Sequence, residues 1–414
     1  MKFSMQTVRH GQARLGTITD LARHPERALA TPLLLTSTQG GSVPHLTIDM
    51  LERLREHVFP LQITLPTLVE SCDTLKAYKK GVGSFLALEN HLLYLSIQDP
   101  AVEPPTGYNE KTCVSVWGQS GRTKVDIEAY ISIVEAFQPD WFQALCDSDT
   151  GKESSLKRIR KSVDRTISFL DSCLKMQEAS KTLGRTNIFG CVEGGSHAEE
   201  RKRSARETAL RPVAGFVLEG IGAIFAAAAD DDDADCETAS APRDLLRLTL
   251  DELPDDKPRL LPGPLNPGSI LEAVELGIDM FDSSYPFLVT SQSAALTFHF
   301  GIDGTSAADL KRADETDVSP SWKIQLDDKR LSDDLRPLVA GCECYTCTTY
   351  TRAYVHHLIN VGELLGKILL MMHNLHHYHM FFVAIRRSLQ WNDDLADLKR
   401  SVASQREDSR IAGS

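Results

Sequence analysis

The sequence lacks several features that would place it in a special class of protein. No stretch of its 414 residues approaches eighteen uninterrupted apolar residues, so we expect no integral membrane segment. The first residues, MKFSMQTVRHGQ, contain no apolar core and no cleavage site of a secretory signal. The formal net charge of −12 argues against a chain that binds nucleic acid alone over a broad basic surface. The composition, 42% hydrophobic and 25% charged, is typical of a soluble globular protein.

A disulfide framework is also lacking. Six of the nine cysteines are scattered along the chain without regular spacing, at positions 72, 113, 146, 173, 191 and 236. They are typical of small apolar core residues in a reducing compartment, so the expected location is the cytosol. The other three cysteines lie together within six residues, and that clustering predicts a different role.

Short apolar runs alternate with amphipathic helical segments from about residue 186 onward. The run NIFGCVEGG precedes the charged segment AEERKRSARETA, and AGFVLEG, PRLLPG and IDMFDSS follow with further helical segments between them. This alternation indicates parallel βα units. Composition alone does not choose between a (β/α)₈ barrel and a doubly wound sheet.

The clustered cysteines, Cys342, Cys344 and Cys347, are spaced closely enough to surround one ion. Zn²⁺ takes four tetrahedral sulfur or nitrogen ligands, so one histidine is needed. A long helix is expected over 351–379, and its spacing leaves six candidates open, with His373 favoured: His356, His357, His373, His376, His377 and His379. A complete Cys₃His set has no open position for water and therefore predicts one structural zinc per chain. The alternative is three reduced core cysteines and solvated histidines.

Acidic residues follow several of the expected strands: Asp147, Glu193, Glu219 and Asp282. In a barrel the working groups lie at the carboxyl ends of strands, where a carboxylate could act as a nucleophile or recognise an amino-bearing base. Each could equally cap the helix that follows it.

These motifs together resemble the tRNA-guanine (queuine) transglycosylase family. The spacing from Cys342 to His373 reproduces the zinc motif of that family, while GCVEGG and ELGIDMFDSSYP are similar to its V-Q-G-G and G-x-D-M-F-D-C-x-x-P-T-R segments. The resemblance covers roughly residues 10–395. It implies an α/β fold, a (β/α)₈ TIM barrel with an attached zinc-binding subdomain, and it selects His373 as the fourth ligand.

The resemblance also implies a division of the chain. Residues 1–335 are expected to form the barrel with its N-terminal strands. They include a disordered acidic insert at 226–241, around Asp230–Asp233, and a variable excursion at 303–335. Residues 336–395 are expected to form the zinc-binding subdomain and C-terminal helices, and 396–414 a flexible tail.

Within the family, the segments SVWGQSGR, QPDWFQ and KRIRKSVDRT are most similar to the accessory-subunit branch of the eukaryotic enzymes. This resemblance implies a heterodimer with a separate catalytic subunit. The pair would exchange guanine for queuine at wobble position 34 of tRNAs with GUN anticodons (Asp, Asn, His and Tyr). It further implies a cytoplasmic protein that can lie peripherally on the mitochondrial outer membrane.

Departures from the family motifs predict the role of the chain. The D-S-G-G-F-Q segment, which supplies an acid, is replaced by LLYLSIQDPAV, in which Asp99 lacks the neighbouring glycines. Glu193 stands in place of the glutamine that binds the base, and Glu219 in place of a glycine. Pro286-Phe287-Leu288 replaces the P-T-R segment that contacts tRNA. Asp282 aligns with the family nucleophile and is expected to be vestigial.

Two hypotheses follow. In the first, the chain is a non-catalytic subunit that supports the catalytic partner and helps to hold tRNA, with the basic segment 157–165 as a candidate contact. That segment is equally typical of the solvated face of a helix. In the second, the chain is a self-sufficient transglycosylase that attacks the ribose C1′ atom with Asp282 and forms a covalent tRNA adduct.

Overall fold

The structure is a computed structural model of the whole chain, and it describes residues 1–6, 12–54, 60–151, 153–230, 236–301, 322–391 and 395–411. A three-stranded antiparallel sheet lies at the N-terminus, in the order β1 (Lys2–Gln6), β2 (Leu15–Thr19) and β3 (Leu29–Thr31). The chain then enters the main sheet of the molecule.

Eight parallel strands close into a barrel, which confirms the predicted fold class. In chain order they are β4 (Leu33–Thr38), β5 (Leu61–Thr64), β6 (Leu93–Ser96), β9 (Trp141–Gln143), β10 (Asn187–Val192), β11 (Gly215–Leu218), β12 (Arg259–Leu260) and β13 (Met280–Asp282). The barrel closes where β13 pairs with β4, with Met280 opposite Leu33 and Asp282 opposite Leu35. Most of these strands are buried along their length and form continuous apolar runs, as expected for a parallel sheet covered on its outer face.

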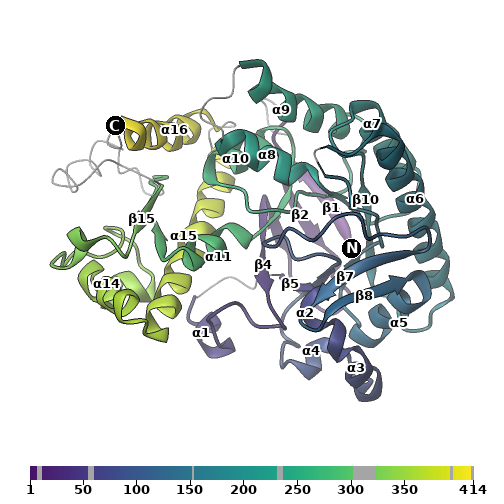
Figure 1. Cartoon of the computed structure of the whole chain (residues 1–414), viewed down its shortest axis with the longest axis horizontal. Coiled ribbons are helices and arrows are strands. Elements are labelled where there is room, and N and C mark those ends of the chain that lie inside the picture. The colour runs from purple at the N-terminus through teal and green to yellow at the C-terminus, as the bar shows by residue number, and fades with distance from the viewer. Residues whose placement is uncertain are drawn as a thin grey trace.

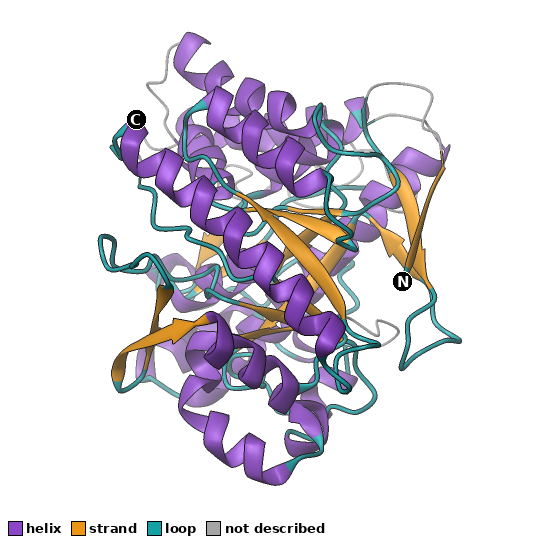
Figure 2. Ribbon diagram, turned by 90° about the vertical axis from the view of Figure 1, so that its right-hand side faces the viewer, coloured by secondary structure: helices purple, strands orange, loops and turns teal. Residues whose placement is uncertain are grey.

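Helices surround the strands, as Figures 1 and 2 show. Those before β9 are α1 (Ile48–Glu52), α2 (Leu65–Leu68), η1 (Val69–Ser71), α3 (Cys72–Tyr78), α4 (Gly81–Phe85) and α5 (Ile127–Phe137). Those after it are α6 (Leu156–Ala179), α7 (Ala198–Ala209), α8 (Ile221–Asp230), α9 (Cys236–Leu250), α10 (Pro267–Glu275) and α11 (Ser284–Ser291). An antiparallel hairpin, β7 (Cys113–Gly118) and β8 (Gly121–Asp126), is inserted between β6 and β9.

The predicted insertions are only partly described. Helix α8 ends at Asp230 and α9 begins at Cys236, so both helices extend into the acidic insert predicted at 226–241. Residues 231–235 of that insert, and 303–321 of the excursion predicted at 303–335, lie outside the described residues. The rest of the excursion contains β15 (Lys323–Gln325), which pairs with β14 (Ala294–Leu296), and η2 (Lys329–Leu331).

The single long helix expected over 351–379 is two helices, α14 (Arg352–Val361) and α15 (Leu364–Trp391). Gly362 ends α14 in the left-handed conformation, with φ of 75°, and its N–H bonds back to the last turn. Glycine accepts this conformation at little cost, which is why it so often ends a helix. The prediction overlooked this glycine inside an otherwise helical pattern.

Helix α15 joins the barrel to the C-terminal subdomain (Figure 1). Its Leu369 and Leu370 belong to an apolar cluster of the subdomain, whereas Met371 and Met372 belong to the barrel core. The helix is therefore apolar on most sides and buried between the two parts. The short α13 (Tyr345–Thr349) packs against it.

The chain ends in α16 (Ala396–Ile411), where the sequence predicted a flexible tail from residue 396. Leu398 and Val402 are buried, and Lys399 forms an ion pair of 2.8 Å with Glu275 of α10. Leu398 and Val402 therefore attach the first half of α16 to the rest of the molecule, although the composition of the tail, which is mostly polar, gave no sign of this.

Candidate metal centre and the strand ends of the barrel

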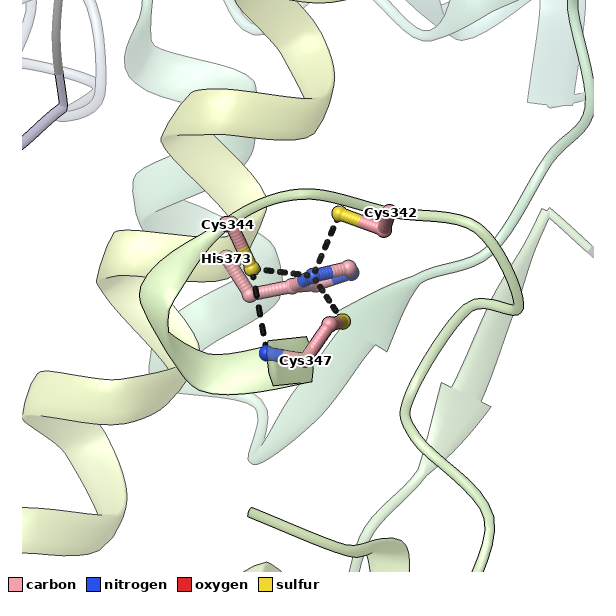
Figure 3. Close-up of side chains that lie close together, drawn as sticks. All are labelled: Cys342, Cys344, Cys347 and His373. Atoms are coloured by element: carbon pink, nitrogen blue, oxygen red, sulfur yellow. Dashed lines mark hydrogen bonds between the residues drawn. The ribbon is translucent and has the colours of Figure 1, made fainter. Parts of the chain in front are cut away.

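A buried cluster of sulfur and nitrogen atoms lies between α13 and α15 (Figure 3). Cys342 and Cys344 precede α13, Cys347 lies within it, and His373 comes from the middle of α15. Cys344 caps α13, because its sulfur accepts a hydrogen bond of 3.3 Å from the Cys347 N–H. The tight turn thereby directs all three sulfurs toward the histidine.

The spacing of these atoms suits a tetrahedral metal ion. The Nδ1 atom of His373 lies 3.9 Å from the Cys342 sulfur, 3.5 Å from that of Cys344 and 3.3 Å from that of Cys347. A tetrahedral Zn²⁺ with ordinary Zn–S and Zn–N bonds separates its sulfur and nitrogen ligands by about 3.6 Å. All four ligand atoms lie within 4.8 Å of one another, so this group could hold one metal ion.

The hydrogen bond made by the other ring nitrogen of His373 favours the tautomer that a metal ligand needs. The Nε2 atom of His373 lies 2.8 Å from the Leu296 carbonyl oxygen, to which it can only donate. A neutral ring then leaves the Nδ1 lone pair free to face the sulfurs. Such a second hydrogen bond is usual for histidines that bind metals, because it fixes the ring and increases its basicity.

The structure also shows which of the six candidate histidines lies with the three cysteines. In the described part of the chain, the single group of metal-ligand type contains His373 and none of the other five. His356 and His377 bond to the carbonyl oxygens of Leu326 and Phe298, at 2.7 and 2.9 Å. His357 is exposed on α14. The residue favoured by the sequence is therefore the one that lies with the cysteines.

Asp282 ends β13 and is almost completely buried. One carboxylate oxygen accepts the Gly263 N–H at 2.7 Å, and the other accepts the N–H of Ser284 at 2.9 Å together with the Ser284 hydroxyl. Burial raises the pKa of Asp282 to about 6, with a smaller contribution from Asp99 in the same direction. Both oxygens are thus engaged within the chain.

Asp99, which follows β6, lies close enough to Asp282 for its charge to act on it. It is buried, its carboxylate accepts the Ala101 N–H at 2.9 Å, and burial raises its pKa. The sequence alone predicted no defined setting for Asp99. The closed barrel nevertheless brings the ends of β6 and β13 near one another.

Glu193 and Glu219 form a second acidic pair at the ends of β10 and β11. Among the described residues, neither carboxyl oxygen of Glu193 has a hydrogen-bond partner, and the side chain is fully buried. Burial first, and then the charge of Glu219, raises the pKa of Glu193 well above its usual value. Burial also raises the pKa of Glu219, although Gln143 donates a hydrogen bond to it.

Arg201 of α7 does not neutralise this pair through hydrogen bonds. Its guanidinium donates instead to three main-chain carbonyls, those of Val192, Gly195 and Glu219, at 3.0, 2.9 and 2.6 Å. Burial lowers the pKa of Arg201 to about 10. Gln143 ends the QPDWFQ segment and Arg201 lies in AEERKRSARETA, but sequence reasoning assigned neither side chain a role, because their partners lie at the ends of other strands.

The Asp147 carboxylate accepts hydrogen bonds from three side chains and therefore has a structural role. Arg158 donates to both of its oxygens, at 3.0 and 2.6 Å, while Arg165 and Asn109 each add a bond of 2.9 Å. Burial alone would raise the pKa of Asp147, but the bonds from Arg158 and Asn109 hold it below the usual value. Two arginines of the basic segment 157–165 are therefore engaged within the chain.

A (β/α)₈ barrel with a Cys₃His cluster on an attached helical subdomain is the class of protein that these features define. A family model described as queuine tRNA-ribosyltransferase matches residues 9–408. The chain belongs to the queuine tRNA-ribosyltransferase family, as its motifs predicted.

Several individual proteins of this family are similar to the chain over nearly its full length. A human protein is 40% identical over 98% of this chain and 100% of its own length. A chicken protein is 41% identical over 95% of both chains, and one from the tick Ixodes scapularis is 41% identical over 94% of this chain and 97% of its own. All three are named queuine tRNA-ribosyltransferase accessory subunit 2, which agrees with the branch indicated by the sequence.

Proposed function

We propose that this chain is the non-catalytic accessory subunit of a heterodimeric queuine tRNA-ribosyltransferase. It supports a catalytic subunit, which exchanges guanine for queuine at wobble position 34 of tRNAs with GUN anticodons. The observation that carries the proposal is the fully buried carboxyl of Glu193, with the half-buried Glu219 beside it, at the strand ends where the family motifs place the base. The names of its full-length relatives support the same role.

The surroundings of Asp282 favour a vestigial residue over a nucleophile. A nucleophilic carboxylate must be reached by its substrate, whereas Asp282 is only 2% exposed and its two oxygens hold the main chain of Gly263 and Ser284. The segment 286–288 lies in α11 and offers no guanidinium to tRNA. A self-sufficient transglycosylase is the alternative, and it keeps support only from the position of Asp282 at the end of β13.

We propose that Cys342, Cys344, Cys347 and His373 hold one Zn²⁺ per chain. Three sulfurs and one imidazole are the donors that Zn²⁺ prefers, and four protein ligands leave no position for water or substrate. When bound, the ion supplies a structural cross-link and no chemistry of its own. The residues around it would tie α13 to α15, and through α15 to the barrel.

The exposed side of α14 is the best candidate for the surface that binds the catalytic partner. Tyr354 lies in the first turn of α14, Val361 is its last residue, and Leu364 begins α15 after the turn between them. These large apolar side chains are 40, 56 and 82% exposed. The ring of Tyr350 stacks on that of Tyr354, with centroids 5.2 Å apart and planes 11° from parallel. Rigid, exposed aromatic and aliphatic groups are typical of the centre of a protein interface.

Pairing of the two subunits tests this role. The wild-type chain should co-purify with the catalytic subunit as one complex of each, measured by light scattering after gel filtration. Leu364→Glu should weaken that complex, because a charge would be buried in the interface. Leu210→Glu is the matched control, since Leu210 is also an exposed leucine, at 80%, but lies after α7. Failure of the wild-type chain to bind the catalytic subunit would refute the accessory role.

The expected location is the cytoplasm, with a peripheral position on the mitochondrial outer membrane as a further proposal from the family resemblance. Within the described ranges, no helix has both the length and the apolar character needed to cross a bilayer. Fractionation of cells with a carbonate or high-salt wash would distinguish a peripheral protein, which the wash releases, from one that stays in the cytoplasm throughout.

A further inference from the structure

Tyr108 is an exposed aromatic residue in the loop between β6 and β7. Its side chain is 44% exposed, and its ring packs edge to face with that of Trp117, with centroids 5.1 Å apart and planes at 81°. The guanidinium carbon of Arg122 lies 5.2 Å from the centre of the Tyr108 ring. Burial in the core therefore does not account for an aromatic and a cation held together at the surface.

The loop that carries Tyr108 is held firmly in place. The N–H groups of Gly107 and Tyr108 donate to the Asp149 carboxylate at 2.7 to 3.1 Å. The Tyr108 carbonyl oxygen accepts from the Ser115 hydroxyl at 2.8 Å and from Arg122 at 2.7 Å. This arrangement fixes the tyrosine before any ligand arrives, which reduces the entropy cost of binding.

The same network joins this loop to the start of α6. Arg165 donates to the Asn109 carbonyl at 3.4 Å, and the Asp147 carboxylate bonds both Asn109 and Arg158. We call the combined segments 107–124, 147–149 and 157–165 the hairpin–α6 surface. They carry eight basic and four acidic residues, in a chain whose net charge is −12. The surface is a local basic region on an acidic protein.

Not every basic residue on this surface is available to a ligand. Arg158 and Arg165 bond to Asp147, and Arg160 forms an ion pair of 3.1 Å with Glu200. Arg122 is engaged too, because it donates to the Ser115 hydroxyl and the Tyr108 carbonyl oxygen and lies 3.6 Å from the Glu110 carboxylate. Lys157 and Lys161 are exposed on α6. Two exposed lysines of α6 and the guanidinium of Arg122, held 5.2 Å from the centre of the Tyr108 ring, therefore remain as basic groups of this surface.

We propose that the hairpin–α6 surface binds RNA, with an unpaired base stacking against Tyr108 and Arg122 while Lys157 and Lys161 contact phosphates. Aromatic rings and guanidinium planes beside a basic groove are the usual means of holding unstacked RNA bases. The hairpin is inserted after β6, and Figure 1 shows β7 and β8 on the same side of the molecule as α5 and α6. The inference rests on the proposed function, because it places tRNA contacts on the accessory subunit as well as its partner.

The test uses the assembled heterodimer and a GUN-anticodon tRNA. Tyr108→Ala should weaken tRNA binding by about 5- to 150-fold, the range for removal of one stacked base, and Tyr108→Phe should retain binding. The KM for tRNA should rise while kcat is unchanged. Tyr78→Ala is the matched control, because Tyr78 is 37% exposed and also packs edge to face, against Phe85. Lys157→Gln with Lys161→Gln should reduce the salt dependence of binding, by about 0.7 in the log–log slope for each phosphate that the lysines no longer neutralise.

A second measurement keeps the inference testable if a variant fails to fold. Ultraviolet crosslinking of tRNA to the wild-type complex should attach RNA to the peptide that contains Tyr108. Unchanged tRNA affinity in folded Tyr108→Ala, or no crosslink in residues 107–124, would overturn the inference while leaving the accessory role intact. Binding of an acidic protein segment there in place of tRNA would overturn it too. A heterodimer that does not form would instead refute the proposed function.

Discussion

Removal of one sulfur from the Cys₃His cluster should empty the metal site and loosen the C-terminal subdomain. We compare Cys344→Ala with Cys173→Ala, since both residues are buried, at 3 and 0% exposure, and only Cys344 belongs to the cluster. Each change removes one buried sulfur, so the cost in packing should be similar. Any additional effect of Cys344→Ala therefore measures the metal.

The size of that effect follows from mass action. A site that holds its ion at a thousand times the dissociation constant stabilises the folded state by about 4 kcal/mol. We expect Cys344→Ala to be less stable by that amount, beyond the effect of Cys173→Ala. The destabilisation should be concentrated around the cluster, because a second apolar group, including Leu369 and Val355, still packs the subdomain.

Metal analysis and hydrogen exchange provide the assay. The wild type and Cys173→Ala should contain one zinc per chain, and Cys344→Ala close to none. Amide exchange in residues 342–349 should accelerate in Cys344→Ala, and in the wild type after a chelator is added. Equal zinc content in the two variants, or a chelator without effect on exchange, would refute the reasoning.

Three further predictions concern the strand ends and the histidines. Glu193→Gln should stabilise the chain at pH 8, by about 1.4 kcal/mol for each unit by which the pKa of Glu193 is raised. Because the pKa is raised in the folded state, the free energy of unfolding of the wild type should fall as pH rises from about 4.5 through that pKa. In urea unfolding from pH 4.5 to 8, this fall should be smaller for Glu193→Gln than for the wild type. Glu200→Gln should do the opposite, because ion pairs with Arg203 and Arg160 lower the pKa of Glu200; equal effects would contradict this account. Arg158→Met should destabilise the chain by up to about 3 kcal/mol, since it leaves the buried Asp147 carboxylate partly unpaired. Arg160→Met is the control: Arg160 is 60% exposed in its ion pair with Glu200, so this change should cost under about 1 kcal/mol in the same assay. His373→Gln should lower the zinc content and His357→Gln should not; retention of zinc by the first would show that another histidine is the ligand.

The parallel βα units were predictable from the sequence because its second half repeats an apolar run followed by an amphipathic helix. The choice of a closed barrel over a doubly wound sheet came instead from the family resemblance. The two-residue strand β12 shows the limit, since PRLLPG identifies it only through its place in that repeat. The Cys₃His cluster was predictable because three cysteines at such short spacing have few other uses. The choice among six histidines needed the family spacing, and the structure agrees with it.

The features that the sequence did not predict depend mostly on contacts between distant parts of the chain. Gly362 ends α14 inside a pattern whose periodicity alone predicts one helix. The proximity of Asp99 to Asp282 follows from closure of the barrel, across 183 positions of sequence. The basic segment 157–165 looked available to tRNA, whereas Asp147 and Glu200 engage its three arginines. Sequence spacing contains none of these pairings.

Base exchange by each subunit alone and by the two together tests the central claim most directly. The measured quantity is incorporation of labelled guanine or queuine into a GUN-anticodon tRNA. We predict no incorporation by this chain alone, full activity from the heterodimer, and the same activity from a heterodimer that carries Asp282→Asn in this chain. Exchange by this chain alone, abolished by Asp282→Asn, would contradict the account and make it a transglycosylase in its own right.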